Sequence, residues 1–310
     1  MTLQKRSYTA GHFELLIDGH ASTAYLKSVD GGFVKASTID EPIGPNNNRI
    51  KHTSVADIEP FSIDCGISGA NDILRWIQSS WRQEFNRRNG QITHANFDLK
   101  RTFEHQFYDA LIAETTFPTL DGSSKDAAFL KVKIQPERVM STKLPGTGGA
   151  PVQANMGSKQ KLWTPASFRL NIDGLDEMKY ANKIDSFTIK QGIKKFYTGE
   201  DRFPQIEPTK VDFPNITGTI SLEFADRLLK WYDDYVVKGK ADLKQQKSGS
   251  IEFLAPDKKS TIFAINLYEI GLQHAQITQS SANADQIKRV KFELYVGRMD
   301  LDGSGGLGME

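Results

Sequence analysis

The segment Phe13-Glu-Leu-Leu-Ile-Asp-Gly19 occurs again as Phe168-Arg-Leu-Asn-Ile-Asp-Gly174, 155 positions further along the chain. In both copies apolar residues alternate with other residues and end at Asp-Gly, which is typical of a half-buried β-strand that runs into a turn. The same shift places Ile73-Leu-Arg-Trp-Ile77 over Leu228-Leu-Lys-Trp-Tyr232. Segments 130–139 and 290–299 also resemble each other, at a shift of 160. Because these pairs keep the same order, the sequence indicates an internal duplication.

The duplication divides the chain into two domains. Residues 141–161 contain Leu-Pro-Gly-Thr-Gly-Gly-Ala-Pro and have neither a strand period nor a helix period, so they predict a linker. We therefore expect a first domain over residues 1–140, the linker over 141–161, a second domain over 162–300 and a flexible tail over 301–310.

Each half is predicted to be mainly β with one helix in its middle. In the first half the strands are expected at 13–17, 61–65 and 130–134, and in the second at 168–172, 187–189, 216–220, 251–254, 263–267 and 290–296. The first helix is expected after the capping residues 68–72, with Ile73, Ile77, Trp81 and Phe85 on one face and Asn89-Gly90 as its end. The second is expected from Asp226 to Val237, closed by Gly239.

Four aromatic and aliphatic side chains are expected to anchor these helices by burial: Ile77, Trp81, Leu228 and Tyr232. Trp76 and Trp231 are equivalent under the repeat, and we interpret them as structural rather than ligand-stacking residues.

The composition of the 310 residues disfavours several classes of protein. Lys and Arg number 39 against 38 Asp and Glu, so strong electrostatic binding to nucleic acid or membrane is not expected. No apolar run approaches the roughly 20 residues of a membrane-spanning helix. The polar start and the single cysteine, Cys65, favour a cytosolic, reducing context.

The residues that usually carry catalysis do not form a recognisable pattern. The six histidines have no metal-site spacing, and Cys65 lies at an alternating strand position that suits a buried hydrophobe. The glycines at 146, 148 and 149 lack the strand, Lys-Ser/Thr and helix of a phosphate-binding loop. We therefore expect no catalytic, cofactor-binding or metal-binding residues, and no enzyme activity.

The order of these elements resembles the phage tail-tube family, which includes the tubes of contractile tails and injection systems. The opening strands 13–19 and 168–174, the strands before the helix in 58–67 and 208–221, and the last strands ending at Val139 and Met299 carry the resemblance. It implies two tandem antiparallel β-sandwich or β-barrel domains, whereas a usual tube subunit has one.

The resemblance also implies a role. The chain is expected to be a structural virion protein, a subunit of a tail tube whose stacked hexameric rings form a conduit for DNA ejection or effector passage. One alternative is a trimeric baseplate hub or tube initiator with pseudo-six-fold symmetry, and a more remote one is a two-domain β binding module. Its partners would be itself, sheath and baseplate proteins, with DNA or effector as transient cargo. Its location would be a virion tail or a cytoplasmic injection apparatus.

Two long segments, 41–59 and 196–208, are expected to be loops that cross an interface between subunits or rings. The residues assigned to this contact are Pro42, Pro45, Asn47, Arg49, Lys51, Arg202, Phe203 and Pro204. Identical β domains that pair their strand edges can close into a ring without free edges.

Overall fold

The chain is mainly antiparallel β, as the sequence predicted, in a computed structural model that describes residues 11–22, 24–44, 48–67, 69–145, 151–152, 163–278 and 287–302. The strands form a ten-stranded sheet, a seven-stranded sheet and a separate two-stranded hairpin. No helix in these ranges is long and apolar enough to cross a membrane.

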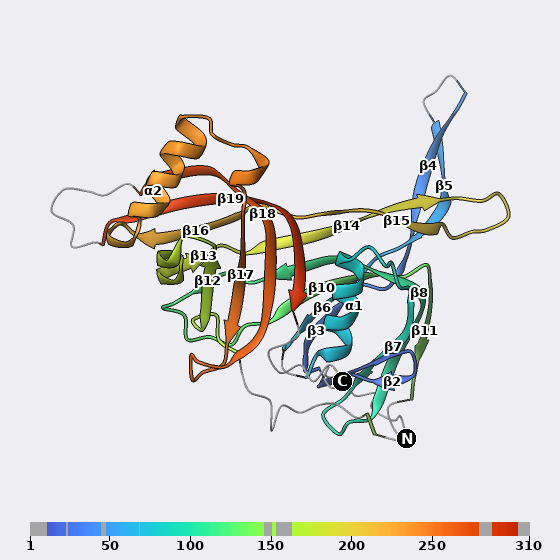
Figure 1. Ribbon diagram of the computed structural model, residues 1–310. Helices are drawn as coiled ribbons and strands as arrows, with labels where there is room; N and C mark the ends of the chain where they lie inside the picture. Colours follow the sequence, from blue (N-terminus) through green and yellow to red (C-terminus); the bar gives the residue numbers. More distant parts are fainter. Residues whose placement is uncertain are drawn as a thin grey trace.

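The first half of the chain contains one helix, α1 (Asn71–Trp81), between groups of strands (Figure 1). The strands are β1 (His12–Ile17), β2 (His20–Ala21), β3 (Leu26–Asp30), β4 (Val34–Ile43), β5 (Asn48–Ile58), β6 (Phe61–Cys65), β7 (Arg88–Ala95), β8 (Arg101–Phe117), β9 (Leu120–Asp121), β10 (Leu130–Gln135) and β11 (Arg138–Lys143). Strand β11 continues into the segment that was predicted to be a linker.

The second half repeats this plan around α2 (Asp226–Tyr232), which continues as a π-helical turn, Asp233–Val237. Its strands are β12 (Phe168–Ile172), β13 (Ala181–Ile184), β14 (Phe187–Phe196), β15 (Gln205–Asp212), β16 (Ile216–Ser221), β17 (Lys247–Leu254), β18 (Thr261–Ile277) and β19 (Arg289–Asp302). Short 3₁₀ turns lie at Asp176–Tyr180, Leu222–Phe224 and Leu243–Gln245.

The two halves have the same strand order. The ten-stranded sheet contains the path β1-β7-β8-β10-β6-β3, and the seven-stranded sheet contains β12-β17-β18-β19-β16-β13. Strands β4 and β5 follow β3 as β14 and β15 follow β13. This agreement supports the duplication that the sequence indicated.

Strand registers fix the residue equivalences between the halves. Gly90 lies opposite Ile17 and Phe107, and Gly249 lies opposite Ile172 and Leu267. A Cβ on Gly90 would lie 2.4 Å from the Leu16 carbonyl oxygen, and one on Gly249 would lie 2.3 Å from that of Asn171. The equivalent strands β7 and β17 therefore both need glycine at this position for the close approach of two backbones.

The helices differ from the sequence prediction in detail. Helix α1 begins after Ala70, which makes no side-chain capping bond, so the predicted polar cap is wrong. It ends at Trp81, because Gln83 and Phe85 have φ of 61° and 50°, outside the helical region. Asn89 and Gly90, predicted as the helix end, lie in β7. The predicted end of the second helix agrees better, since the π-helical turn stops at Val237 and Gly239 has φ 67°.

Of the two segments predicted as long loops, 41–59 lies mostly in a β-hairpin, whereas most of 196–208, residues 197–204, is the connection between two strands. Strands β4 and β5 pair from Val34 opposite Ile58 to Ile43 opposite Asn48, and form a narrow arm that projects from the body (Figure 1). Strands β14 and β15 form a second arm, which extends from the second half across the first (Figure 1). In the paired parts of both arms, the ladders satisfy the backbone groups that face the partner strand, which a loop would leave to water.

One continuous apolar core lies between the sheets and the helices and includes residues from both halves. The side chains of Trp76 and Trp231 are 1% and 8% exposed, as expected for structural residues. Cys65 is fully buried, as predicted for a core residue, and burial raises the pKa of its thiol to about 12.

Candidate assembly interface

The two halves of the chain are joined by a strand pair. β14 of the second half pairs antiparallel with the end of β8 of the first, with Phe187 opposite Phe117 and Lys190 opposite Glu114. On its other edge the same part of β8 pairs with β10, so the sheet of the first half continues into the second. We call the contacts between the halves the internal junction.

Aromatic rings from both halves fill the internal junction. The rings of Phe117 and Phe187 are stacked with centroids 5.1 Å apart, and both side chains are buried. Phe253 lies 5.6 Å from Phe117 on the second-half side, and Trp81 of α1 lies 6.1 Å from it on the first-half side. Burial of such rings is the largest source of stability available to a small contact area.

The C-terminal end of α1 contacts β19 through polar groups. Arg82 donates from Nε and Nη2 to the carboxylate of Asp300, at 3.0 and 2.8 Å, and this contact raises the pKa of Arg82 above its usual value. Gln78 Nε2 donates to the carbonyl oxygen of Leu301. A bidentate Arg-carboxylate pair fixes orientation as well as adding energy.

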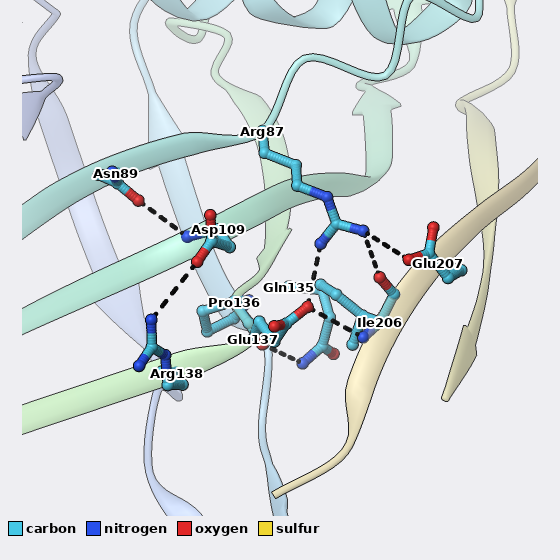
Figure 2. A network of polar contacts seen from close by, with 9 residues as sticks. All are labelled: Arg87, Asn89, Asp109, Gln135, Pro136, Glu137, Arg138, Ile206 and Glu207. Carbon is cyan, nitrogen blue, oxygen red and sulfur yellow. Dashed lines mark hydrogen bonds and ion pairs between the residues drawn. The ribbon is translucent and has the colours of Figure 1, made fainter. Parts of the chain in front are cut away.

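Figure 2 shows a second polar contact, in which Arg87 links the first half to β15. Arg87 lies 3.0 Å from the Glu137 carboxylate and 3.2 Å from that of Glu207, and it donates to the Ile206 carbonyl oxygen. The Ile206 N–H in turn donates to Glu137 at 3.1 Å. Since Glu137 accepts from both halves, loss of Arg87 would leave a partly buried carboxylate with one partner fewer in this contact.

The base of the β4–β5 arm is connected to the outer part of the β14–β15 arm. Lys195 of β14 lies 2.6 Å from both carboxylate oxygens of Asp57 in β5. This ion pair holds β14 against the strand that leads out of the first arm.

The predicted contact residues lie on two separate arms. Pro42 lies opposite Arg49 near the end of the β4–β5 arm, and Arg49 and Lys51 lie 4.0 and 3.7 Å from Asp40. Pro45 and Asn47 fall outside the described residues. Arg202, Phe203 and Pro204 lie in the connection between β14 and β15, where they border a hollow with Glu137 and Arg138. The ends of the arms point in different directions, so the two groups do not form one surface (Figure 1).

The four predicted helix anchors have the expected positions. Ile77, Trp81 and Leu228 are 0%, 4% and 2% exposed, and Tyr232 is partly buried against the core. Among them, Trp81 also belongs to the internal junction, where it lies 6.4 Å from Phe213 of the second half.

Apart from Trp81, which was predicted only as a helix anchor, the residues of the internal junction described above were missed by sequence reasoning. Phe117, Phe187, Arg87 and Glu137 carry no local motif, and their partners are distant in the chain. One signal in the sequence could have indicated them. Some equivalent positions of the two halves differ in polarity, such as Arg82 in the first half and Val237 in the second. Such a difference marks a position where the residue of one half has a polar partner and its equivalent in the other half does not.

Two histidines of the first half lie side by side, His105 buried and His94 half-buried. Their rings are 5.7 Å apart, and Nδ1 of His105 lies 2.8 Å from the hydroxyl oxygen of Ser141. Burial lowers the pKa of His94, and burial together with the neighbouring His94 lowers that of His105 to about 4. In the described part of the chain, no three His, Cys, Asp or Glu side chains are grouped as metal ligands would be.

No protein-family model and no curated protein matches the sequence. Solved structures do. A chain of the sheath-tube complex of an extracellular contractile injection system is 17% identical with a TM-score of 0.40, over 46% of this chain and 95% of that one. A chain of the tube-terminating cap of the anti-feeding prophage is 14% identical with a TM-score of 0.38, over 46% and 100%. Hcp1 from Flavobacterium johnsoniae is 13% identical with a TM-score of 0.27, over 44% and 94%.

Proposed function

We propose that this chain is a non-catalytic structural subunit of a tail-tube-type assembly, in which copies of the chain join edge to edge into rings. The rings stack into a conduit through which DNA or an effector protein passes. The observation that carries the proposal is the internal junction, because two domains of one topology already pair there through their strands. Pairing between identical domains is the way in which β domains close into rings.

The charge of the chain supports a conduit. The formal net charge is +1, with 39 basic and 38 acidic side chains. A surface rich in unpaired Lys and Arg would retain DNA through its phosphates, whereas a balanced one lets cargo pass.

The geometry favours one arrangement of the two domains. A subunit whose second domain decorated the outside of a ring would place the two domains in different layers. Here the halves share a ladder between β8 and β14 and therefore lie side by side. This favours the trimeric hub or tube initiator, in which three chains supply six domains, over a hexamer with outer domains.

Microscopy and mass measurement test the proposal. The purified chain is expected to form rings or tubes in negative stain, and light scattering of the smallest ring is expected to give three chains. Six chains per ring would favour the tube subunit with outer domains. A chain that stays monomeric across concentration, salt and pH would overturn the structural role.

A further inference from the structure

Residues 274–277 of β18, which are equivalent to the residues of β8 that pair with β14, have a free edge in the described part of the chain. Phe107 and Leu267 lie opposite the equivalent glycines Gly90 and Gly249, so β8 and β18 are related by a shift of 160. Residues 114–117 of β8 pair with β14, whereas the equivalent residues 274–277 of β18 pair only with β19 in the described part of the chain. A free edge of this kind is a template for another strand.

The base of β4 corresponds to the strand that occupies this edge in the internal junction. Lys35 lies opposite Asp57 in the first arm, and Lys190 lies opposite Asp212 in the second, which gives a shift of 155. Val34 is thus equivalent to Ile189, and Phe33 to Thr188. β4 pairs with β5 on one side and with no described strand on the other.

Apolar side chains that are buried in the internal junction are exposed at the equivalent positions. Phe117 is 0% exposed and its equivalent Ile277 is 56% exposed, while Ile189 is 2% exposed and Val34 is 47% exposed. Trp81, 4% exposed, corresponds to Val236, 38% exposed. Exposed apolar residues are ordinary when they are scattered over a surface. These residues instead occupy the positions equivalent to the internal junction, where the described chain offers no second strand to cover them.

The helix contact of the internal junction has an apolar counterpart. Arg82 and Asp300 form an ion pair there, and the positions equivalent to them are Val237 and Met140. Both replacements are exposed, Val237 at 63% and Met140 at 61%. If Val237 and Met140 meet in a contact between two copies, both positions are expected to be apolar together. A charged residue at only one of them would be buried without a partner.

Met140 also lies beside a hollow that could accept such a side chain. The hollow has a volume of about 290 Å³ and is lined by Tyr108, Arg138, Val139, Met140 and Phe203. Its lining is therefore mainly apolar and combines β8 and β11 of the first half with Phe203 of the β14–β15 connection.

We propose that residues 272–277 of β18, with Val236 and Val237, bind a second copy of this chain through its Phe33, Val34 and Met140. The proposal rests on the proposed function and supplies its contact surface. The register follows that of the internal junction, so Phe33 lies opposite Gln276 and Val34 opposite Ala275 of the next copy. The contact is head to tail, and it closes into a ring in which first and second halves alternate.

Disulfide cross-linking tests the register. The double variant Phe33→Cys with Gln276→Cys is expected to give covalent multimers of the assembled protein on oxidation, because directly opposite Cα atoms lie roughly 4.5–5.5 Å apart, within the range that a disulfide spans. The matched control is Thr116→Cys with Thr188→Cys, the equivalent pair of the internal junction, whose hydroxyl oxygens are 2.9 Å apart. This control is expected to cross-link within one chain. A second control, Phe33→Cys with Leu243→Cys, also places cysteines at two exposed positions. It is expected to give no multimers, because the proposed contact does not bring these positions together.

A surface substitution tests the same contact independently of cysteine geometry. Ile277→Asp is expected to raise the concentration required for assembly by about tenfold or more, because a carboxylate would be buried against Val34. Ile287→Asp, at another exposed position, is expected to leave assembly unchanged. If the unmodified chain forms rings but the cysteine pair does not cross-link and Ile277→Asp assembles normally, the contact is wrong and the proposed function stands. If the unmodified chain does not assemble, both are overturned.

Discussion

Where the first half has the half-buried His94 and the buried His105, the second half has Phe253 and Ile265 at the equivalent positions. Phe103 and Phe263 are also equivalent. Phe253 and Phe263 stack with centroids 4.1 Å apart, whereas His94 and Phe103 meet edge to face at 6.1 Å. The same strand order therefore supports either an apolar core or one with ionisable rings.

A second difference shows how volume is kept constant. Ile63 lies opposite Val132 in the first half, and the equivalent pair in the second is Gly218 opposite Phe292. A large side chain has replaced a medium one on one strand, and its neighbour has lost its side chain altogether. Cores tolerate such exchange when the total volume is preserved. When facing core residues change together in this way, the two halves keep the same fold although the residues at these positions differ.

The largest expected effect is the difference in stability loss between a substitution in the internal junction and one at the equivalent exposed position of β18. Phe117→Ala is expected to lower the free energy of unfolding by about 3–5 kcal/mol, because it leaves a cavity among four aromatic rings. Ile277→Ala, at the equivalent exposed position, is expected to change it by less than about 0.5 kcal/mol in the unassembled chain. Urea unfolding at a concentration below assembly measures both. Equal losses would contradict the view that only one of these junctions is formed within the chain.

The exchange of volumes can be tested by restoring a side chain. Gly218→Ala is expected to cost about 2–3 kcal/mol, because its Cβ would lie 2.6 Å from the Phe292 ring and 2.6 Å from the Lys183 carbonyl oxygen. Adding Phe292→Val is expected to recover part of this loss, since the ring is removed while the backbone contact remains. A double-mutant cycle by thermal unfolding gives the coupling. Strict additivity of the two substitutions would show that the pair is not coupled.

The polar link between the halves is expected to contribute less. Arg87→Ala should lower the free energy of unfolding by about 1–3 kcal/mol, since Glu137 and the Ile206 carbonyl oxygen lose a charged donor. The control is Arg138→Ala, whose side chain is 66% exposed and 3.7 Å from Asp109, with an expected change below about 0.5 kcal/mol. Chemical unfolding compares them, and an Arg138 effect as large as that of Arg87 would argue against a specific link.

His105, which lies in the first half, predicts that the free energy of unfolding depends on pH. Because the pKa of His105 is lowered from 6.5 to about 4 in the folded chain, the unfolded chain binds more protons between these values. Stability should therefore fall as the pH drops from about 6.5 towards 4, by on the order of 1 kcal/mol. His105→Gln is expected to flatten this part of the profile relative to the unmodified chain, measured by unfolding at closely spaced pH values. A variant with an unchanged slope would exclude His105 as the source.

Much of the fold follows from the sequence. The alternation in 168–172 and 216–220 and the apolar steps of both helices predicted elements that the structure contains, because local periodicity reflects which face of an element is buried. The repeat predicted that the second half would follow the first, and the two sheets do share one strand order.

The sequence also misled at particular residues. Phe85 continued the apolar spacing of α1, yet the chain leaves the helix after Trp81 and Phe85 has φ 50°. The polar residues of 41–59 suggested a loop, because an arm that projects from the body has no buried face to impose an apolar alternation. Pairing with the neighbouring strand, rather than burial, defines β4 and β5.

The sequence by itself predicted a duplication, with two mainly β halves that each have a central helix, because a duplication preserves periodicity and order even when residues change. Only the tertiary structure decided how the copies are joined. The ladder between Phe117 and Phe187, the Arg87–Glu137 contact and the Arg82–Asp300 pair connect residues far apart in the chain. Such contacts depend on backbone edges and on charges that meet only after folding, so no local pattern encodes them.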